Sequence, residues 1–400
     1  MPYAAIAGDL AAVIDTFAET LCSAGTALAE RSAATRAAAR FQVTVTEGAD
    51  AVAAAAGDWR TLEAAGGAAT AFQSLALAHR AAAVHARRGE IPRVVVIRDR
   101  GRAAVVLPTV ISRIGGVRVI RFLGDPLIQY GDILAAPDAD MTAVELALRT
   151  AEDRSRATVM MLRRVRADAR IAPLLARRGT VVMEQAAPFV DISAGPAAHA
   201  RDQRELRRLR RRLADAGDCR FAVLQGGAAR AAVAEALRLK RGWLVGRGMP
   251  SSVIGHSDWE DAILAVADDA SLLRAAILTV AGRLAAVEVG LVHAGRWHAF
   301  IGAHAPEFSR LGPGHVQMAE TIATCRAQGF AVYDLLAPGD AYKIKIAHGA
   351  VAVRDHVVAL TGAGRLGLIA APLLPAVKQL ASRMPPGLRR ILLGTAAPQG

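Results

Sequence analysis

Residues 297–345 read WHAFIGAHAPEFSRLGPGHVQMAETIATCRAQGFAVYDLLAPGDAYKIK, and this stretch decides the fold. The Gly-Pro-Gly sequence at 312–314 predicts the start of a helix near His315, because proline fits a helix start and glycine permits the turn before it. Trp297–Gly302 is predicted as a strand, and the mostly apolar segment 330–336 as a second strand buried on both faces. A strand, a helix and a parallel strand thus follow one another in about 40 residues, as in a βαβ unit.

The start of this helix also predicts an anion-binding site. Its first N–H groups have no partner within the helix, and the aligned peptide dipoles favour phosphate or carboxylate there. Gly312 and Gly314 carry no side chains, so a ligand can approach the backbone closely. A Gly-Pro-Gly sequence is also an ordinary turn signal, and the flanking strands are what favour the ligand site.

The same order of predicted elements occurs twice along the chain, which indicates an internal duplication of one α/β unit. In each copy, short turns separate the three strands of a predicted meander. These strands lie at 91–98, 103–112 and 117–123 in the first copy, and at 275–280, 285–292 and 297–302 in the second.

The two copies differ in the connection that leads into the helix after the meander. Residues 134–140 of the first copy contain no glycine and carry Asp138 and Asp140. Two carboxylates would repel a phosphate group, and Asp140 is a favourable N-cap for the helix predicted near 141–153. We therefore predict that the second copy binds the anionic ligand.

The chain resembles the GNAT superfamily of acyltransferases, and within it the cellulose-biosynthesis-associated CelD/BcsL type with its BioF2-like acetyltransferase domain. The resemblance is carried by Leu311-Gly312-Pro313-Gly314, by Tyr333-Asp334-Leu335-Leu336 after Gly329, by Asp340-Ala341-Tyr342-Lys343 and, upstream, by Leu239-Lys240-Arg241-Gly242-Trp243. It implies an α/β fold of tandem GNAT-like units, each a mixed, largely antiparallel sheet flanked by helices, as in the related Fem transferases. The predicted domains are a helical segment at 1–39, a first unit with a degenerate donor site at 40–195, a second, acyl-CoA-binding unit at 196–355 and a tail at 356–400.

The resemblance implies direct transfer of an acyl group from coenzyme A to an amine or hydroxyl acceptor, with acetyl-CoA or another acyl-CoA as co-substrate and no metal. A sugar or a polysaccharide or cell-envelope precursor is the implied acceptor. The expected donor-binding residues are Arg310, Gly312, Gly314, His315 and Val316.

The resemblance and the required chemistry also imply four catalytic residues. Either Asp334 or Glu288 would take the acceptor's proton if burial raised its pKa, and Tyr342 would protonate the leaving thiolate. Lys343 would neutralise phosphate or the developing oxyanion. Ordinary structural roles stay open for each of these: a capping or solvent-facing carboxylate, an aromatic anchor and a surface lysine.

Two departures from the family pattern keep other functions open: Ser309 stands where Arg or Gln is usual, and Asp340 where Glu is usual. One alternative is a Fem-like transferase that uses aminoacyl-tRNA, with which the net charge of +13 is compatible. Another is a non-catalytic module that binds part of a polysaccharide-synthesis assembly.

Composition limits the function classes without choosing among them. The 400 residues carry a net charge of +13, which favours acidic partners. No apolar run is long enough to span a bilayer and no secretory leader is recognised, so we expect a cytoplasmic protein. The basic run at 201–217 places three leucines on one helical stripe and its arginines on solvated faces.

Cysteines and histidines give no metal-ligand pattern. Cys22, Cys219 and Cys325 are widely spaced, and His293 and His298 lie near each other without a recognised motif. Trp243 and Trp259 could line an acceptor groove, although large aromatic side chains are more often in a core.

Overall fold

The computed structural model describes residues 40–194, 200–362 and 364. The predicted helical segment at 1–39 with Cys22, the predicted boundary between residues 195 and 196, and the tail from 365 onward lie outside the described residues. Residues 40–194 are called the first half below, and residues 200–364 the second half.

The meander predicted in the first half is confirmed. Strands β2, β3 and β4 pair antiparallel in sequence order, and β1 pairs with the free edge of β2. The elements of this half are β1 (Phe41–Glu47), α2 (Ala51–Ala54), α3 (Ala56–Ala64), a 3-10 turn (Ala71–Gln73), α4 (Leu75–Arg87), β2 (Ile91–Asp99), β3 (Arg102–Ile114), β4 (Val117–Phe122), β5 (Leu134–Ala135), α5 (Met141–Glu152), β6 (Val159–Arg166), α6 (Ala172–Arg178) and β7 (Thr180–Asp191).

The second half repeats this order, which confirms the predicted duplication. An additional basic helix, α7, precedes the repeat. Its Leu209 and Leu213 are buried, whereas Arg204, Arg207, Arg208, Arg210 and Arg211 are exposed. The elements are α7 (Ala200–Asp215), β8 (Cys219–Gln225), α8 (Gly227–Val245), α9 (Ser257–Val266), β9 (Leu273–Val280), β10 (Arg283–His293), β11 (Arg296–His304), a 3-10 helix (Pro306–Leu311), α10 (Pro313–Ala327), β12 (Val332–Asp334), α11 (Ala341–Ile346) and β13 (Gly349–Ala359).

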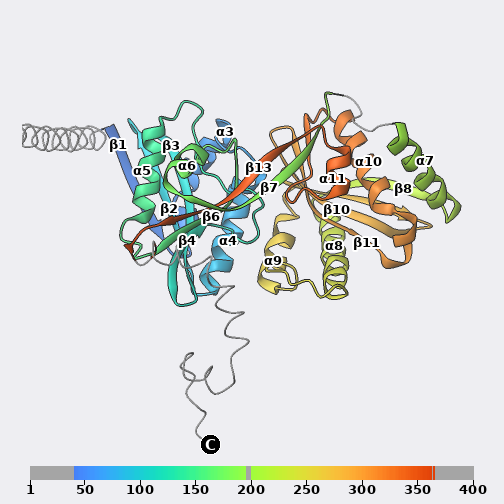
Figure 1. Ribbon diagram of the computed structural model, residues 1–400, viewed down its shortest axis with the longest axis horizontal. Coiled ribbons are helices and arrows are strands. Elements are labelled where there is room, and N and C mark those ends of the chain that lie inside the picture. The colour runs from blue at the N-terminus through green and yellow to red at the C-terminus, as the bar shows by residue number, and fades with distance from the viewer. Residues whose placement is uncertain (1–39, 195–199, 363, 365–400) are drawn as a thin grey trace, which may run out of the picture.

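One mixed, largely antiparallel sheet runs through both halves, and helices flank it (Figure 1). The strand order is β1-β2-β3-β4-β6-β13-β7-β12-β11-β10-β9-β8, with β5 paired to β3. Only β4–β6 and β11–β12 pair in parallel within the described residues. The predicted fold class, an α/β fold built from two such units, is therefore confirmed.

The two halves exchange strands at the centre of this sheet. Strand β13, from the end of the second half, lies between β6 and β7, and β7, from the end of the first half, pairs with β12. Figure 1 shows both strands running between the two lobes. Val190 and Ile192 at the end of β7 join the buried cluster that contains Trp297 and Tyr333 of the second half. Each half thus depends on a strand from the other.

The sequence pattern also predicts helices at 59–65 and 72–87, and their bounds differ from the structure. The first begins three residues earlier, at Ala56. The second is a 3-10 turn followed by α4, because Ser74 caps α4 by accepting a hydrogen bond from the Leu77 N–H. The strand predicted at 330–336 is only Val332–Asp334, because the chain leaves its neighbour β11 after Asp334.

Candidate functional site

Strands β11 and β12 diverge, and a cavity opens beside this divergence. Its lining includes the end of β11 but no residue of β12. The two strands pair only through Arg296–Val332, Trp297–Tyr333 and His298–Asp334, after which β11 continues alone to His304. The cavity has a volume of 340 Å³ and adjoins α8 on one side and the start of α10 on the other. Its lining comprises Leu239, Lys240, Trp243, Glu288, Gly302, Ala303, His304, Ser309, Gly312, Pro313, Gly314, His315, Gln317, Met318 and Tyr342.

A β-bulge in β11 lies beside this divergence. Val289 pairs with Ile301 and Gly290 with Ala299, so Phe300 is the extra residue that the ladder leaves unpaired. A bulge bends its strand and redirects backbone groups, and bulges are common next to active sites. Gly290 is required here, because a Cβ at this position would lie 2.2 Å from the indole ring of Trp297.

Glu288 is the buried carboxylate of the cavity. Its two oxygens accept hydrogen bonds from the indole N–H of Trp297 at 2.8 Å and the hydroxyl of Tyr333 at 2.6 Å. Burial raises the pKa of Glu288, and the hydrogen bonds from Tyr333, Trp297 and Gln317 oppose that rise. A carboxylate with a raised pKa, held at the edge of a cavity, has the properties of a general base.

The start of α10, which lies close to its predicted position, adjoins this cavity. Gly312 precedes the helix with a φ of +68°, and a Cβ there would lie 3.0 Å from Leu209 of α7. A Cβ at Gly314 would meet no atom within 4 Å, so the backbone of this first turn is open to a ligand. The ring of His315 lies 6.1 Å from that of Tyr342, and both line the cavity.

The other two predicted donor-binding residues lie elsewhere. Val316 is buried in the main hydrophobic core. Arg310 is not part of the cavity lining, and its carbonyl accepts a hydrogen bond from Nη2 of Arg212 at 3.0 Å. Ser309 does line the cavity, where its hydroxyl donates to the carbonyl of Pro306 at 2.7 Å.

Tyr342 and Lys343 are adjacent on α11 but have different surroundings. Burial, followed by the negative charges of Asp340 and Glu288, raises the pKa of Tyr342, so its hydroxyl keeps its proton at neutral pH. Lys343 is buried, and its Nζ donates to the carbonyls of Leu336 at 3.1 Å and Pro338 at 3.0 Å. Tyr342 therefore faces the cavity, whereas Lys343 fixes the loop after β12.

Asp334 lies outside the cavity lining, in a fully buried network between the two halves. Its carboxylate accepts hydrogen bonds from the hydroxyl of Tyr130 at 2.7 Å, from Arg166 at 3.2 Å and from Arg296 at 3.1 Å. The N–H of Leu336 donates to it as well, at 3.0 Å. The structure thus brings Glu288 and Tyr342 together with the α10 start, and holds Asp334 in a separate ion network.

Sequence reasoning did not assign Lys240 and His304 to the site. Both line the cavity, and the charges of Lys240 and Arg247 add to burial in lowering the pKa of His304. Trp243 lies between Lys240 and Arg247, with its ring centroid 4.6 Å and 4.3 Å from the two cationic groups. The spacing of Lys240 and Trp243, three residues apart on one helix, was the available signal, since it places both on one face.

The remaining candidates lie outside this cavity. Trp259 is fully buried and is not part of the cavity lining. His293 contacts the carbonyl of Ala68 at 3.0 Å, and His298 is fully buried. Within the described residues, His, Cys, Asp and Glu form no group that could hold a metal ion. No helix in that part of the chain is both long and apolar enough to cross a membrane.

One protein family matches part of the chain. Residues 200–344 match the family described as the acetyltransferase (GNAT) domain. This match contains α10, Glu288 and Tyr342, and supports an acyltransferase. No curated protein matches the chain significantly.

Solved structures share the fold at low sequence identity. FemX superposes with a TM-score of 0.50 and 11% identity over 69% of this chain and 90% of its own. A conserved protein of unknown function from Bacteroides thetaiotaomicron VPI-5482 superposes with a TM-score of 0.50 and 13% identity, over 76% of this chain and 97% of its own. A tandem GNAT protein from the clavulanic acid biosynthesis pathway superposes with a TM-score of only 0.44 and 12% identity, over 80% of this chain and 99% of its own. The chain has a tandem GNAT-like fold, with a GNAT acetyltransferase domain match in its second half.

Proposed function

We propose that the chain is an acyl-CoA-dependent N-acyltransferase, an acetyltransferase in the simplest case, that uses the cavity beside the divergence of β11 and β12. The observation that carries this proposal is the meeting, in one 340 Å³ cavity, of an open helix start, a buried carboxylate and a protonated tyrosine. These groups provide an anion-binding site, a base and an acid. Transfer of an acyl group from a thioester to an amine requires all three.

In this proposal the first turn of α10 at Gly314 binds the phosphates of coenzyme A. Glu288 takes a proton from the acceptor amine, directly or through a water molecule, as the nitrogen attacks the thioester carbonyl. In the bulge at Phe300 the backbone is not paired in the ladder, and a backbone N–H group there is the proposed donor to the oxyanion of the tetrahedral intermediate. The C–S bond then breaks, and Tyr342 donates its proton to the leaving thiolate.

Asp334 and Lys343 have positioning roles in this proposal. The contacts of Asp334 with Tyr130 and Arg296 fix the end of β12, and Lys343 fixes the loop that follows. Both therefore maintain the width of the divergence. Trp243, with the cations on either side of it, is the proposed wall of the acceptor site.

The finer parts of the proposal rest on resemblance. We propose the CelD/BcsL type, a cytoplasmic location and an acceptor that is a sugar or a polysaccharide or cell-envelope precursor. We also propose that residues 40–195 and 196–355 act as a structural unit and a donor-binding unit. Their strand exchange at β7 and β13 means that these units share one sheet.

Calorimetric titration with acetyl-CoA and free CoA tests the proposal. Gly314→Val adds a side chain where the protein leaves open space, so it should weaken binding at least about tenfold while the fold is preserved. Gly227→Val is the matched control, because Gly227 begins α8 and is equally open. Absence of binding to either ligand, or equal binding by both variants, would refute the CoA assignment.

One observation favours an aminoacyl-tRNA donor as a second candidate. Arg204, Arg207 and Arg211 of α7 are exposed, and α7 contacts Gly312 through Leu209. A basic helix beside the proposed donor-binding site suits a polyanionic donor such as tRNA. Donor binding that falls steeply with added salt, and that is lost when these arginines become glutamine, would support RNA over CoA.

A further inference from the structure

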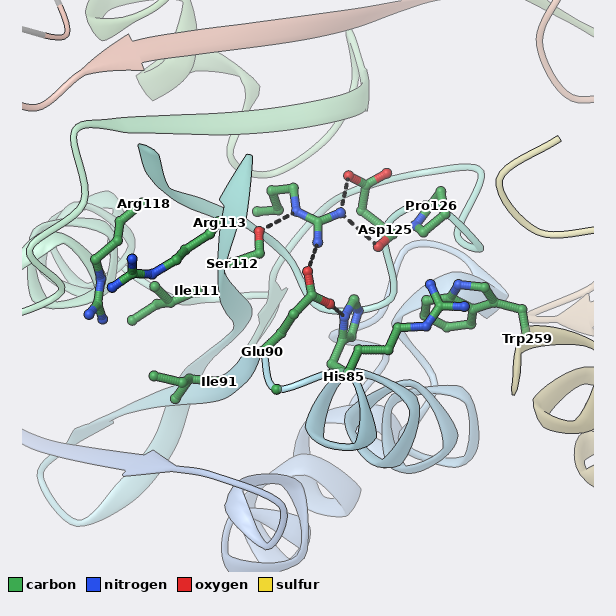
Figure 2. A pocket seen from close by; sticks show the side chains of 13 residues that line it. His85, Glu90, Ile91, Ile111, Ser112, Arg113, Arg118, Asp125, Pro126 and Trp259 are labelled. Carbon is green, nitrogen blue, oxygen red and sulfur yellow. Dashed lines mark hydrogen bonds and ion pairs between the residues drawn. The ribbon is translucent and has the colours of Figure 1, made fainter. Parts of the chain in front are cut away.

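A second cavity, of 370 Å³, lies against the first half and shares no lining residue with the cavity beside the divergence of β11 and β12. It is bounded by the end of α4, the start of β2, the β3–β4 hairpin and Trp259 of α9 (Figure 2). Its size is within the range of small-molecule sites. Trp259 belongs to the second half, so both halves contribute to the cavity.

The two carboxylates in this cavity are already satisfied. Glu90 accepts hydrogen bonds from Arg121 at 2.7 Å and from Nδ1 of His85 at 2.5 Å. Arg121 also pairs with Asp125 at 3.1 Å. Burial lowers the pKa of His85, and its Nε2 accepts from the N–H of Gly124, so this imidazole is neutral with its proton on Nδ1. The acidic groups therefore need no added cation.

Two arginines in the lining lack such partners. Arg113 and Arg118 stand directly opposite each other on β3 and β4, and neither has a carboxylate within ion-pair distance among the described residues. Like charges at directly opposed positions of an antiparallel pair destabilise it. Figure 2 shows both side chains extending together beside Ile111. The Nε–H of Arg118 is buried without an acceptor.

Another donor lacks an acceptor at the opposite end of the cavity. The indole N–H of Trp259 has no hydrogen-bond partner in the described structure, although the side chain is fully buried. The guanidinium of Arg88 lies 5.4 Å from the centre of this ring and is held there by Asp258 at 3.3 Å. Buried N–H groups are rarely left unpaired in native proteins, and a ligand is one explanation.

We propose that this cavity binds a small molecule through its oxyanion groups, phosphate or carboxylate. Every unpartnered group at the site is a donor, and Arg113 and Arg118 also carry unneutralised positive charge. Guanidinium groups bind carboxylate and phosphate oxygens in pairs. An oxyanion between Arg113 and Arg118 removes their repulsion, and a second acceptor on the same molecule satisfies Trp259. The proposal is independent of the acyltransferase assignment.

Titration calorimetry and thermal unfolding with inorganic phosphate and with succinate test it, at ionic strength held constant with sodium chloride. We expect saturable binding and a raised midpoint for the unmodified chain. The double substitution Arg113→Gln with Arg118→Gln should weaken binding roughly ten- to hundredfold, since two charge-assisted contacts are lost. The matched control is Arg102→Gln, an exposed arginine at the other end of β3, which should bind normally.

The result also separates the ligand classes and the two cavities. Stronger binding of phosphate indicates a phosphorylated ligand, and stronger binding of succinate a carboxylate ligand. Any probe bound at the start of α10 should be lost in Gly314→Val, and the binding that this variant retains should be lost in the double variant, so failure of the CoA assignment does not affect this test. Absence of saturable binding to both probes, equal binding by the double variant, or equal loss in Arg102→Gln would overturn the proposal.

Discussion

Within the described residues two parallel strand pairs diverge, and the loops after them leave spaces of different size. In the first half, β4 and β6 pair at Val119–Val159 and Ile120–Met160 before they part. The loop at 123–133 fills the space beyond, and a Cβ at Gly131 would lie 2.4 Å from the ring of Phe122. The cavities lined by Gly131 or Asp132 of this loop measure 10 and 90 Å³, against 340 Å³ for the cavity beside the divergence of β11 and β12. The fold supplies the divergence, and the loop after it decides whether a ligand can enter.

The helices that follow the two divergences also differ, because the start of α5 is capped by a side chain and the start of α10 is not. In the first half, Asp140 caps α5 by accepting a hydrogen bond from the N–H of Thr142 at 2.9 Å. Its carboxylate thus occupies the position that an anionic ligand would need. In the second half, Gly312 and Gly314 leave the start of α10 without a side-chain cap. One helix start is satisfied internally, and the other is open.

The largest effect is expected at Glu288, the carboxylate of the open divergence. Glu288→Gln removes the proposed base and should reduce acyl transfer roughly 10²- to 10⁴-fold, with CoA binding retained. The rate of the unmodified chain should rise with pH through the raised pKa of Glu288, and the variant should lack this rise. Release of free CoA thiol from acetyl-CoA with an amine acceptor measures both. An unchanged pH profile in the variant would remove Glu288 from the mechanism.

The next effect is on stability, at the network that joins the two divergences. Asp334→Asn leaves Arg166 and Arg296 facing a neutral group, and removing one partner of a buried ion pair costs about 3–5 kcal/mol. Urea unfolding should show this loss. Asp340→Asn is the control, because Asp340 is half-exposed and lies 3.6 Å from Lys343, where a pair contributes about 1 kcal/mol or less. Equal losses in both variants would contradict the assigned role of Asp334.

The loop that fills the first divergence should respond to pH. Burial raises the pKa of Asp132 from 3.8 to about 6, against hydrogen bonds from the N–H groups of Arg170, Ile133 and Ile171. Between these two values the folded state binds more protons than the unfolded state. Stability should therefore fall as pH rises through this window, by roughly 2–3 kcal/mol in total, and level off above it.

Asp132→Asn tests this directly, because asparagine does not titrate. The difference in unfolding free energy between the two proteins should shift in favour of the variant as pH rises from about 4 to 6. Urea titrations at several pH values measure that difference. A difference that stays constant with pH would show that the Asp132 pKa is not raised.

The smallest expected effect is on stability, and it is tested by substituting one glycine from each divergence. Gly131→Ala forces a Cβ against Phe122 and the Arg163 carbonyl, and such overpacking costs about 1–3 kcal/mol. Gly314→Ala meets no atom within 4 Å, so it should leave stability unchanged or raise it slightly. Thermal unfolding of the two variants provides the measurement. Similar destabilisation at both positions would mean that the second divergence is as closed as the first.

The sequence predicted local features well. Turn glycines located the meander, the Gly-Pro-Gly sequence located the start of α10, and Asp140 was identified as a cap. These features depend on backbone conformation and on neighbours along the chain, which a single sequence displays. The cavity position followed, because a helix after a strand begins where that strand ends.

The sequence did not predict the partners of the candidate residues. Tyr130 and Asp334 are 204 positions apart, and Arg166 and Asp334 are 168 apart. Such contacts depend on which strands become neighbours, and nothing in the sequence indicated that β13 would insert between β6 and β7. For the same reason the sequence left both Asp334 and Glu288 as candidate bases, although only Glu288 of the two lines the cavity.

The strand exchange has a consequence for synthesis of the protein on the ribosome. When β7 is complete, the inner edge of β6 still lacks its partner, because β13 ends only at Ala359. At usual elongation rates this edge stays uncovered for roughly ten to thirty seconds, and unpaired strand edges are sites of aggregation. We therefore expect the nascent first half to need protection until nearly the whole chain has been made, and we expect neither half to fold independently when excised.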